Sequence, residues 1–176
     1  MRLTLSPHPD FPGPADTRIE VEVARPGPLA LELTYVLTGR IADLAIPPVA
    51  ASARADELWR HTCFEAFIRP APGEAYVELN LAPSTQWAAY RFTGYREGMA
   101  PAEIAPPRLE VRAADGRLTL AAALDLAALP DFATAPWRLA LSAVIEDHAG
   151  AKSYWALAHP FGRPDFHHAA GFVTEL

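Results

Sequence analysis

The chain has 176 residues, of which 51% are hydrophobic and 20% are charged, and its formal net charge is −6. This length is typical of one domain, so we expect residues 1–176 to form a single folded unit with a substantial core. The negative charge argues against nucleic acid and anionic membranes as partners, and no apolar run is long enough to span a bilayer.

The N-terminal sequence and the cysteine content bear on where the protein resides. The first residues contain no apolar segment of signal-peptide length, so we expect a cytoplasmic protein. The one cysteine, Cys63, excludes an internal disulfide and a cysteine-based zinc site.

Alternation of apolar and polar residues predicts strands near the start of the chain. Residues 2–5 are typical of a short edge strand, and 18–23 and 29–39 alternate on either side of a Pro/Gly turn. Two such runs across a turn predict an antiparallel hairpin. Prolines 47 and 48 then interrupt the pattern, and one helical turn is expected within 53–61.

The stretch 57–99 gathers aromatic, acidic, amide and guanidinium side chains more densely than any other part of the sequence. Alternation here predicts three strands, at 62–69, 74–82 and 86–95, joined by loops of three to four residues. Consecutive strands with such short connections form a meander. Neighbouring positions on the three strands can therefore present side chains to one shared face.

The remaining sequence continues the strand pattern. The dipeptide Asp115-Gly116 predicts a hairpin over 108–124, followed by one helical turn within 125–132. Strands are expected at 137–147 and 153–158, before an aperiodic segment that contains the sequence PDFHH. About ten short strands and one or two helical turns predict an all-β fold, an antiparallel β-sandwich of jelly-roll-like form.

A candidate ligand site follows from the polar and aromatic side chains of this meander. Carboxylate, amide and guanidinium groups can hydrogen-bond sugar hydroxyls, while the flat face of a tryptophan can pack against the C–H groups of a sugar ring. The alternative is a solvated face on which these charges form cross-strand ion pairs. Tyr76, Trp87, Tyr90 and Phe92 are individually more typical of a core than of a ligand platform. The candidate site residues are Glu65, Glu78, Asn80, Arg91, Trp59 and Trp87.

The sequences DELWRHTCFEAFI and YVELNLAPSTQWAAYRF resemble the DOMON-like superfamily, which includes family 9 carbohydrate-binding modules and haem-binding cytochrome domains. The resemblance covers most of the chain and is strongest to bacterial stand-alone DOMON-like proteins. It implies a jelly-roll-like sandwich whose Trp59 and Glu65 contact a sugar, with Trp155 as a second aromatic clamp. The calcium-ligand pattern of the sugar-binding modules is not recognisable in this sequence.

Other chemistries have weaker sequence signals. A haem site would pair Met99 with His148 or His159, but no spacing links these residues, and we expect no cofactor. His167 and His168 are adjacent, and side chains of adjacent residues in an extended chain point apart, so no metal site is expected.

Two further function classes remain open: a hydrolase that uses Glu65 and Glu78 as paired carboxylates, and a protein-interaction module without a small ligand. No catalytic motif is present. The sequence therefore favours a non-catalytic domain that binds a small molecule, with a saccharide or similar polyol as the expected ligand.

Overall fold

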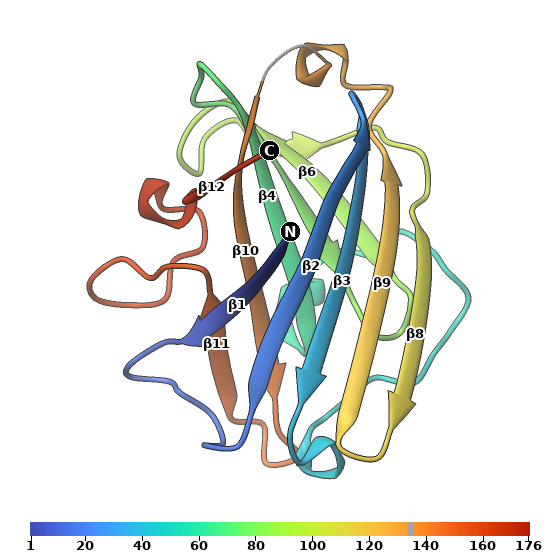
Figure 1. Ribbon diagram of the computed structural model, residues 1–176, viewed down its shortest axis with the longest axis vertical. Helices are drawn as coiled ribbons and strands as arrows, with labels where there is room; N and C mark the ends of the chain where they lie inside the picture. The colour runs from blue at the N-terminus through green and yellow to red at the C-terminus, as the bar shows by residue number, and fades with distance from the viewer. Residues whose placement is uncertain (134–135) are drawn as a thin grey trace.

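The computed structural model describes residues 1–133 and 136–176, and its regular structure is almost entirely antiparallel β (Figure 1). Within these residues the strands are β1 (Arg2–Pro7), β2 (Arg18–Gly27), β3 (Ala30–Thr38), β4 (Cys63–Pro70), β5 (Tyr76–Leu81), β6 (Trp87–Phe92), β7 (Ala100–Pro101), β8 (Arg108–Ala114), β9 (Arg117–Asp125), β10 (Trp137–Glu146), β11 (Lys152–Ala156) and β12 (Thr174–Glu175). The short 3-10 helices are η1 (Ile41–Asp43), η2 (Leu58–Arg60), η3 (Pro130–Phe132) and η4 (Ala169–Gly171). None of these described helices is long enough and apolar enough to cross a membrane.

The strands form one curled sheet that folds over itself into two layers. The first layer has the order β1-β2-β3-β9-β8, and the second has the order β7-β6-β5-β4-β10-β11, with β12 added beside β10 (Figure 1). Strand β1 joins the layers, because residues 2–5 pair with β2 and residues 6–7 pair with β11. The predicted antiparallel β-sandwich is therefore confirmed.

The main core lies between the two layers and follows from the alternation of the strands. Val21 on β2 and Leu79 on β5 are buried and belong to the same apolar cluster. The ring of Tyr35 on β3 lies 4.9 Å from that of Phe64 on β4, and its hydroxyl donates a hydrogen bond of 2.7 Å to the carbonyl of Glu65. A polar contact thus crosses the core and ties the layers together.

A second, smaller apolar cluster covers the opposite face of β4, β5 and β6. The C-terminal segment (residues 157–173) lies over this face, where Phe172 packs within 6.4 Å of Phe67 and 5.8 Å of Tyr76, measured between ring centroids. Both faces of β4 and β5 are therefore buried, and the alternative of a solvated polar face is wrong. The members of this cluster are Phe67, Tyr76, Ala88, Tyr90, Phe92, Ala140 and Phe172.

The observed elements differ from the predicted ones mainly at their ends. The described residues hold twelve strands, and the two beyond the expected ten or so include the two-residue pieces β7 and β12, which are too short to show a periodic pattern. The hairpin turn lies at Asp115-Gly116 as predicted, with Gly116 at a φ of +68° that favours glycine. The two expected helical turns are present as η2 and η3, each only three residues long.

Candidate functional site

A pocket of about 440 Å³ opens on the outer face of the second layer, beneath the C-terminal segment. Its floor comes from β4, β5 and β6, one wall from β10 and β11, and its remaining sides from η2, the β6–β7 connection and the C-terminal segment. This volume lies within the range of small-molecule sites. The residues that line this glutamate pocket are Trp59, Glu65, Glu78, Tyr90, Phe92, Arg96, Met99, Val144, Lys152, Tyr154, Pro164, Phe166 and His167.

The two glutamates reach the pocket because of the register of their strands. Glu65 lies opposite Asn80 in the β4–β5 pair, and Glu78 lies opposite Phe67. Since side chains alternate along a strand, all four point away from the main core, and the two glutamates are diagonal neighbours. They are buried nevertheless, with 3% and 6% of their surfaces exposed.

Hydrogen bonds hold one oxygen of each carboxyl in place. Ser142 donates to Oε2 of Glu65 at 3.2 Å, and the amide nitrogen of Asn80 donates to Oε1 of Glu78 at 2.7 Å. The Cys63 sulfur lies 3.7 Å from the amide oxygen of Asn80 and 3.6 Å from the carbonyl oxygen of Phe64, two acceptors for its one thiol hydrogen. Among the described residues no donor contacts Oε1 of Glu65, so this oxygen is available to a ligand.

A chain of hydrogen bonds orients His167 beside Glu78. The backbone N–H of Arg96 donates to the Tyr76 hydroxyl at 3.3 Å, and that hydroxyl lies 2.7 Å from Nδ1 of His167. The direction of this bond depends on the ring tautomer: where the hydroxyl donates to Nδ1, the ring proton lies on Nε2. Nε2 then faces Oε2 of Glu78 at 3.7 Å.

Burial dominates the electrostatics of the pocket. Loss of water, together with the charge of Glu78, holds the pKa of Glu65 well above its ordinary value. Burial also raises the pKa of Glu78, against the opposing effects of the Asn80 hydrogen bond and the Arg96 charge. The pKa of His167 is lowered to about 4 by burial and by the positive charge of Arg96. His167 is therefore neutral at physiological pH.

Aromatic rings form the walls around these polar groups. Trp59, on η2, is 47% exposed, so a flat ring face is free at the edge of the pocket. Tyr90 is held by a hydrogen bond of 2.6 Å from its hydroxyl to Asp56, and the rings of Tyr154 and Phe166 lie 6.1 Å apart. This combination of buried carboxyls and ring faces matches the mixed polar and apolar surface of a small polar ligand.

The structure brings some of the predicted site residues together. Trp59, Glu65 and Glu78 line the glutamate pocket, and Asn80 is buried beside it, where it orients Glu78. Their role in binding stays a prediction, but their convergence satisfies the geometric condition for a shared site.

Three other predicted residues lie elsewhere, and the expectation that they share this face is wrong. Trp87 and Trp155 are buried in the main core, at 5% and 3% exposure. Arg91 is exposed and alternates with Tyr90 on β6, so it points away from the pocket. The predicted aromatic clamp of Trp59 with Trp155 is not formed, because the two side chains lie on opposite faces of the second layer.

Sequence reasoning missed much of the pocket. Lys152 and Tyr154 occupy the outward positions of β11, which the alternation of 153–158 could have indicated. Arg96 and Phe166 come from segments without periodicity, so no sequence signal marked them. His167 had been considered only as a metal ligand.

The two histidines considered as haem ligands, His148 and His159, contact backbone carbonyls. These carbonyls belong to Ala42 and Ser6, and neither histidine lines the pocket that contains Met99. Within the described residues no three His, Cys, Asp or Glu side chains gather as a metal site requires.

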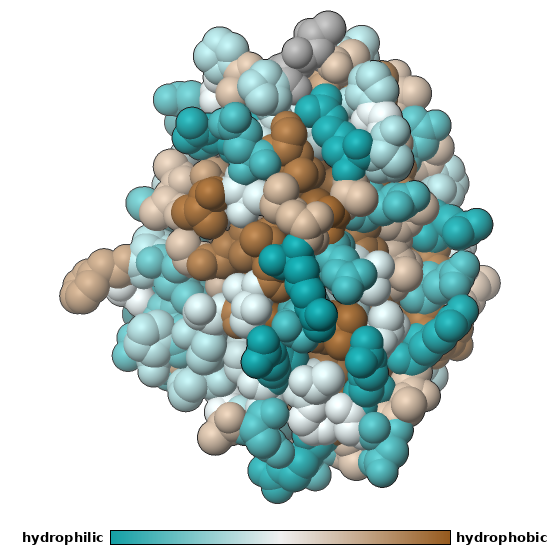
Figure 2. Space-filling view, in the orientation of Figure 1, coloured by the Kyte–Doolittle hydropathy of each residue, from teal (hydrophilic) through white to brown (hydrophobic). Residues whose placement is uncertain are grey.

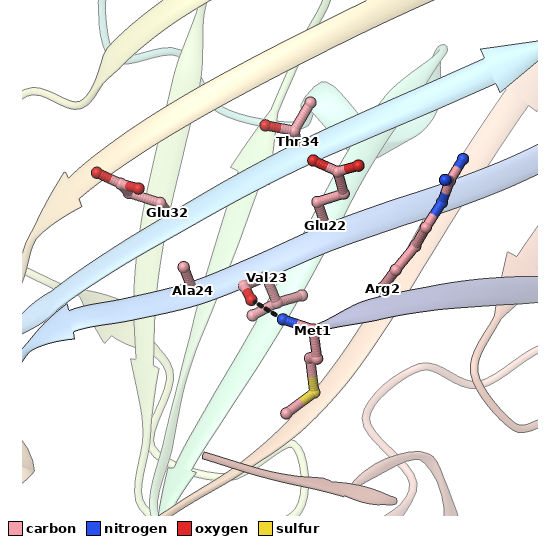
Figure 3. A pocket seen from close by; sticks show the side chains of 7 residues that line it. All are labelled: Met1, Arg2, Glu22, Val23, Ala24, Glu32 and Thr34. Atoms are coloured by element: carbon pink, nitrogen blue, oxygen red, sulfur yellow. Dashed lines mark hydrogen bonds between the residues drawn. The ribbon is translucent and has the colours of Figure 1, made fainter.

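The outer face of the first layer offers a different kind of hollow. Hydrophilic side chains gather over β2 and β3 on this face (Figure 2), and a depression of about 330 Å³ lies among them. In Figure 3 the Met1 amino group donates to the Val23 carbonyl at 2.6 Å, whereas Glu22 and Glu32 extend into solvent. This hollow has no buried polar side chain, so the glutamate pocket is the stronger candidate.

Comparisons with known proteins concern the fold. A proposed carbohydrate-binding protein from Bacteroides uniformis matches with a TM-score of 0.76 and 14% identity, over 98% of this chain and 84% of its own. A family 9 carbohydrate-binding module from Caldicellulosiruptor kristjanssonii, solved with glucose and with cellotriose, matches with a TM-score of 0.51 and 11% identity. These two matches cover 90% of this chain and 75% and 74% of the module chains. No protein-family model and no curated protein matches the sequence. The chain therefore shares its fold with carbohydrate-binding proteins, including a family 9 module.

Proposed function

We propose that this protein binds a saccharide or a similar polyol in the glutamate pocket, without transforming it. The observation that carries this proposal is the pair of buried carboxyls, Glu65 and Glu78, within a pocket that also exposes the ring of Trp59. Carboxylate oxygens accept hydrogen bonds from sugar hydroxyls, and ring faces pack against sugar C–H groups. The shared fold with a module solved in complex with glucose and cellotriose supports the proposal.

Calorimetry with glucose and cellotriose tests this proposal directly. We expect Trp59→Ala to weaken binding about tenfold, because the stacking surface at the pocket edge is lost. Phe161→Ala is the matched control, since Phe161 is a fully exposed aromatic residue that does not line this pocket. Equal losses in both variants, or binding that neither variant changes, would remove Trp59 from the site.

Glycoside hydrolysis is the second candidate function, and the raised pKa of Glu65 favours it, because a general acid must be protonated near neutral pH. However, Glu65 and Glu78 extend from adjacent strands toward the same side. A glycosidase instead places its two carboxyls on either side of the scissile bond. We therefore expect no release of chromophore from aryl glycosides, and release that Glu65→Gln abolishes would establish hydrolysis instead.

Three broader assignments accompany this function as proposals. The sequence resemblance supports a DOMON-like domain, the length supports one domain over residues 1–176, and a cytoplasmic location is the third proposal. Fractionation of cells that express the protein from its own gene checks the last of these, and recovery outside the cytoplasm would contradict it.

A further inference from the structure

The glutamate pocket holds two buried carboxyls with no cation opposite them. In the described part of the chain, no lysine or arginine lies within ion-pair distance of Glu65 or Glu78. The nearest basic group is Nε2 of His167, 3.7 Å from Glu78, and this ring is neutral because burial lowers its pKa to about 4. Buried carboxyls without a paired cation keep a raised pKa, and a cationic ligand between them would lower it again by favouring the charged form.

Within the residues that the structure describes, neither cationic side chain of the pocket forms an ion pair with a glutamate, and the charge of Arg96 offsets only part of the effect of burial on the pKa of the two carboxyls. The guanidinium of Arg96 is bonded to Asp165 at 2.8 Å, and the Tyr95 hydroxyl donates to the same carboxylate. Lys152 lines the pocket as well, but among the described residues its ammonium forms no ion pair with either glutamate. The unpaired oxygen of Glu65, on a side chain only 3% exposed, therefore faces the space that a ligand would occupy.

The walls of the pocket favour a positive charge for an independent reason. The lining includes the rings of Trp59, Tyr90, Tyr154 and Phe166. An aromatic face carries negative electrostatic potential and attracts ammonium groups, most strongly where water is excluded. The aromatic rings and the carboxyls therefore both favour a positively charged ligand.

We propose that the saccharide bound in this pocket carries a protonated amino group, which lies between Glu65 and Glu78. This inference rests on the proposed saccharide function and narrows its ligand class to amino sugars. The ammonium group would donate to Oε1 of Glu65 and Oε2 of Glu78, the two oxygens to which no residue of 1–133 or 136–176 donates at hydrogen-bond distance. The sugar hydroxyls and ring would meet the aromatic walls.

Calorimetry with four sugars of one ring type measures this charge preference. Glucosamine carries the ammonium group, glucose and N-acetylglucosamine are neutral, and glucuronate is anionic. At about pH 6.5 we expect glucosamine to bind about ten- to a hundredfold more tightly than glucose, the effect of one charge-assisted hydrogen bond. N-acetylglucosamine should not share this gain, because it keeps the nitrogen but loses the charge.

Isosteric Glu→Gln variants test whether the two carboxyls cause the preference for a positively charged sugar. Glu65→Gln and Glu78→Gln should each lower the ratio of glucosamine to glucose affinity by about tenfold, since either variant removes one charged partner. Glu22→Gln changes the net charge by the same amount on an exposed strand position, and should leave the ratio unchanged. A ratio that changes equally in all three variants would overturn the proposal.

The four sugars and tetramethylammonium together distinguish a failure of the amino-sugar inference from a failure of the proposed saccharide binding. Equal affinity for glucose and glucosamine, or a preference for glucuronate, would overturn the amino-sugar inference and leave saccharide binding intact. Binding of tetramethylammonium with no binding of any sugar would support the cation preference and overturn the saccharide function. No binding of any of these compounds would overturn both.

Discussion

The carboxyl of Glu65 illustrates how one residue can serve a site at the expense of stability. Its hydrogen bond from Ser142 satisfies only one oxygen, and burial raises its pKa well above the ordinary value of 4.5. A carboxyl with a raised folded-state pKa carries no penalty below its unfolded pKa, and destabilises the fold increasingly as the pH rises above it. The ligand-free protein therefore retains an unfavourable buried group at neutral pH.

Glu65→Gln should relieve this penalty. We expect a gain in unfolding free energy on the order of 1 kcal/mol at about pH 8, which disappears near pH 4, because Gln has no charge to bury. Urea denaturation at several pH values measures the difference. Glu22→Gln, at an exposed position, is the control, and a gain at Glu65 that did not vary with pH would contradict the prediction.

His167 has the opposite linkage to pH. Its side chain is 14% exposed, and its pKa falls from 6.5 to about 4 on folding, so the folded protein binds fewer protons than the unfolded chain between these values. Stability should fall as the pH drops through this window, by on the order of 2–3 kcal/mol from this residue. In His167→Phe, the fall in unfolding free energy between neutral pH and about pH 4 should be smaller by this amount, because Phe does not titrate.

Urea denaturation between about pH 4 and 7 compares His167→Phe with His168→Phe, the same change at the exposed neighbouring position. Parallel stability curves for the wild type and His167→Phe would refute the assignment, even if the variant is less stable overall after losing its bond to Tyr76.

At the scale of elements, the contact between β3 and β4 links the two layers directly beneath the pocket. The Tyr35 hydroxyl is buried and donates at 2.7 Å to the Glu65 carbonyl, and burial raises its pKa well above the ordinary value. Tyr35→Phe removes this donor and leaves the ring in place against Phe64. We expect a loss of about 1–2 kcal/mol in unfolding free energy, measured by chemical denaturation.

Tyr35→Phe also tests how much the inter-layer hydrogen bond stabilises β4 beneath the pocket. Tyr76→Phe provides a comparison, since the Tyr76 hydroxyl bonds His167 in the pocket rather than crossing the core. An unchanged stability in Tyr35→Phe would show that the inter-layer hydrogen bond contributes little to holding β4 beneath the pocket.

At the scale of the whole molecule, the pocket depends on parts of the chain that are distant in sequence. Residues of η2, of the meander β4–β6 and of the C-terminal segment converge on it, so it exists only in the folded protein. A ligand that binds the folded state alone stabilises it by an amount that grows with the logarithm of the ligand concentration above the Kd. At about one hundred times the Kd, this amounts to about 2.7 kcal/mol, or a rise of about 5–10 °C in Tm.

Thermal unfolding with increasing concentrations of a bound saccharide checks this expectation. Trp59→Ala should show a smaller rise in Tm at the same ligand concentration, whereas Phe161→Ala should match the wild type. A rise that did not depend on ligand concentration would exclude binding to the native state.

Local sequence patterns are sufficient to predict the strands and the two acidic positions of the site. The alternation around Glu65 and Glu78 predicts that both point to one face, because the period of two is a local property of an extended chain. The Asp115-Gly116 turn is likewise local, since its backbone conformation depends on the two residues that form it. These features needed no knowledge of distant contacts.

Long-range packing determines which face of each strand belongs to the main core and which segments cover the other face. Trp155 is a ligand-platform candidate from the resemblance and Trp87 is a candidate for either role, and packing against the first layer places both in the core. Arg96 and His167 entered the pocket from segments whose sequences carry no periodicity. Local patterning separates the two faces of a strand, but the burial of each face depends on long-range packing, which no short stretch of sequence contains.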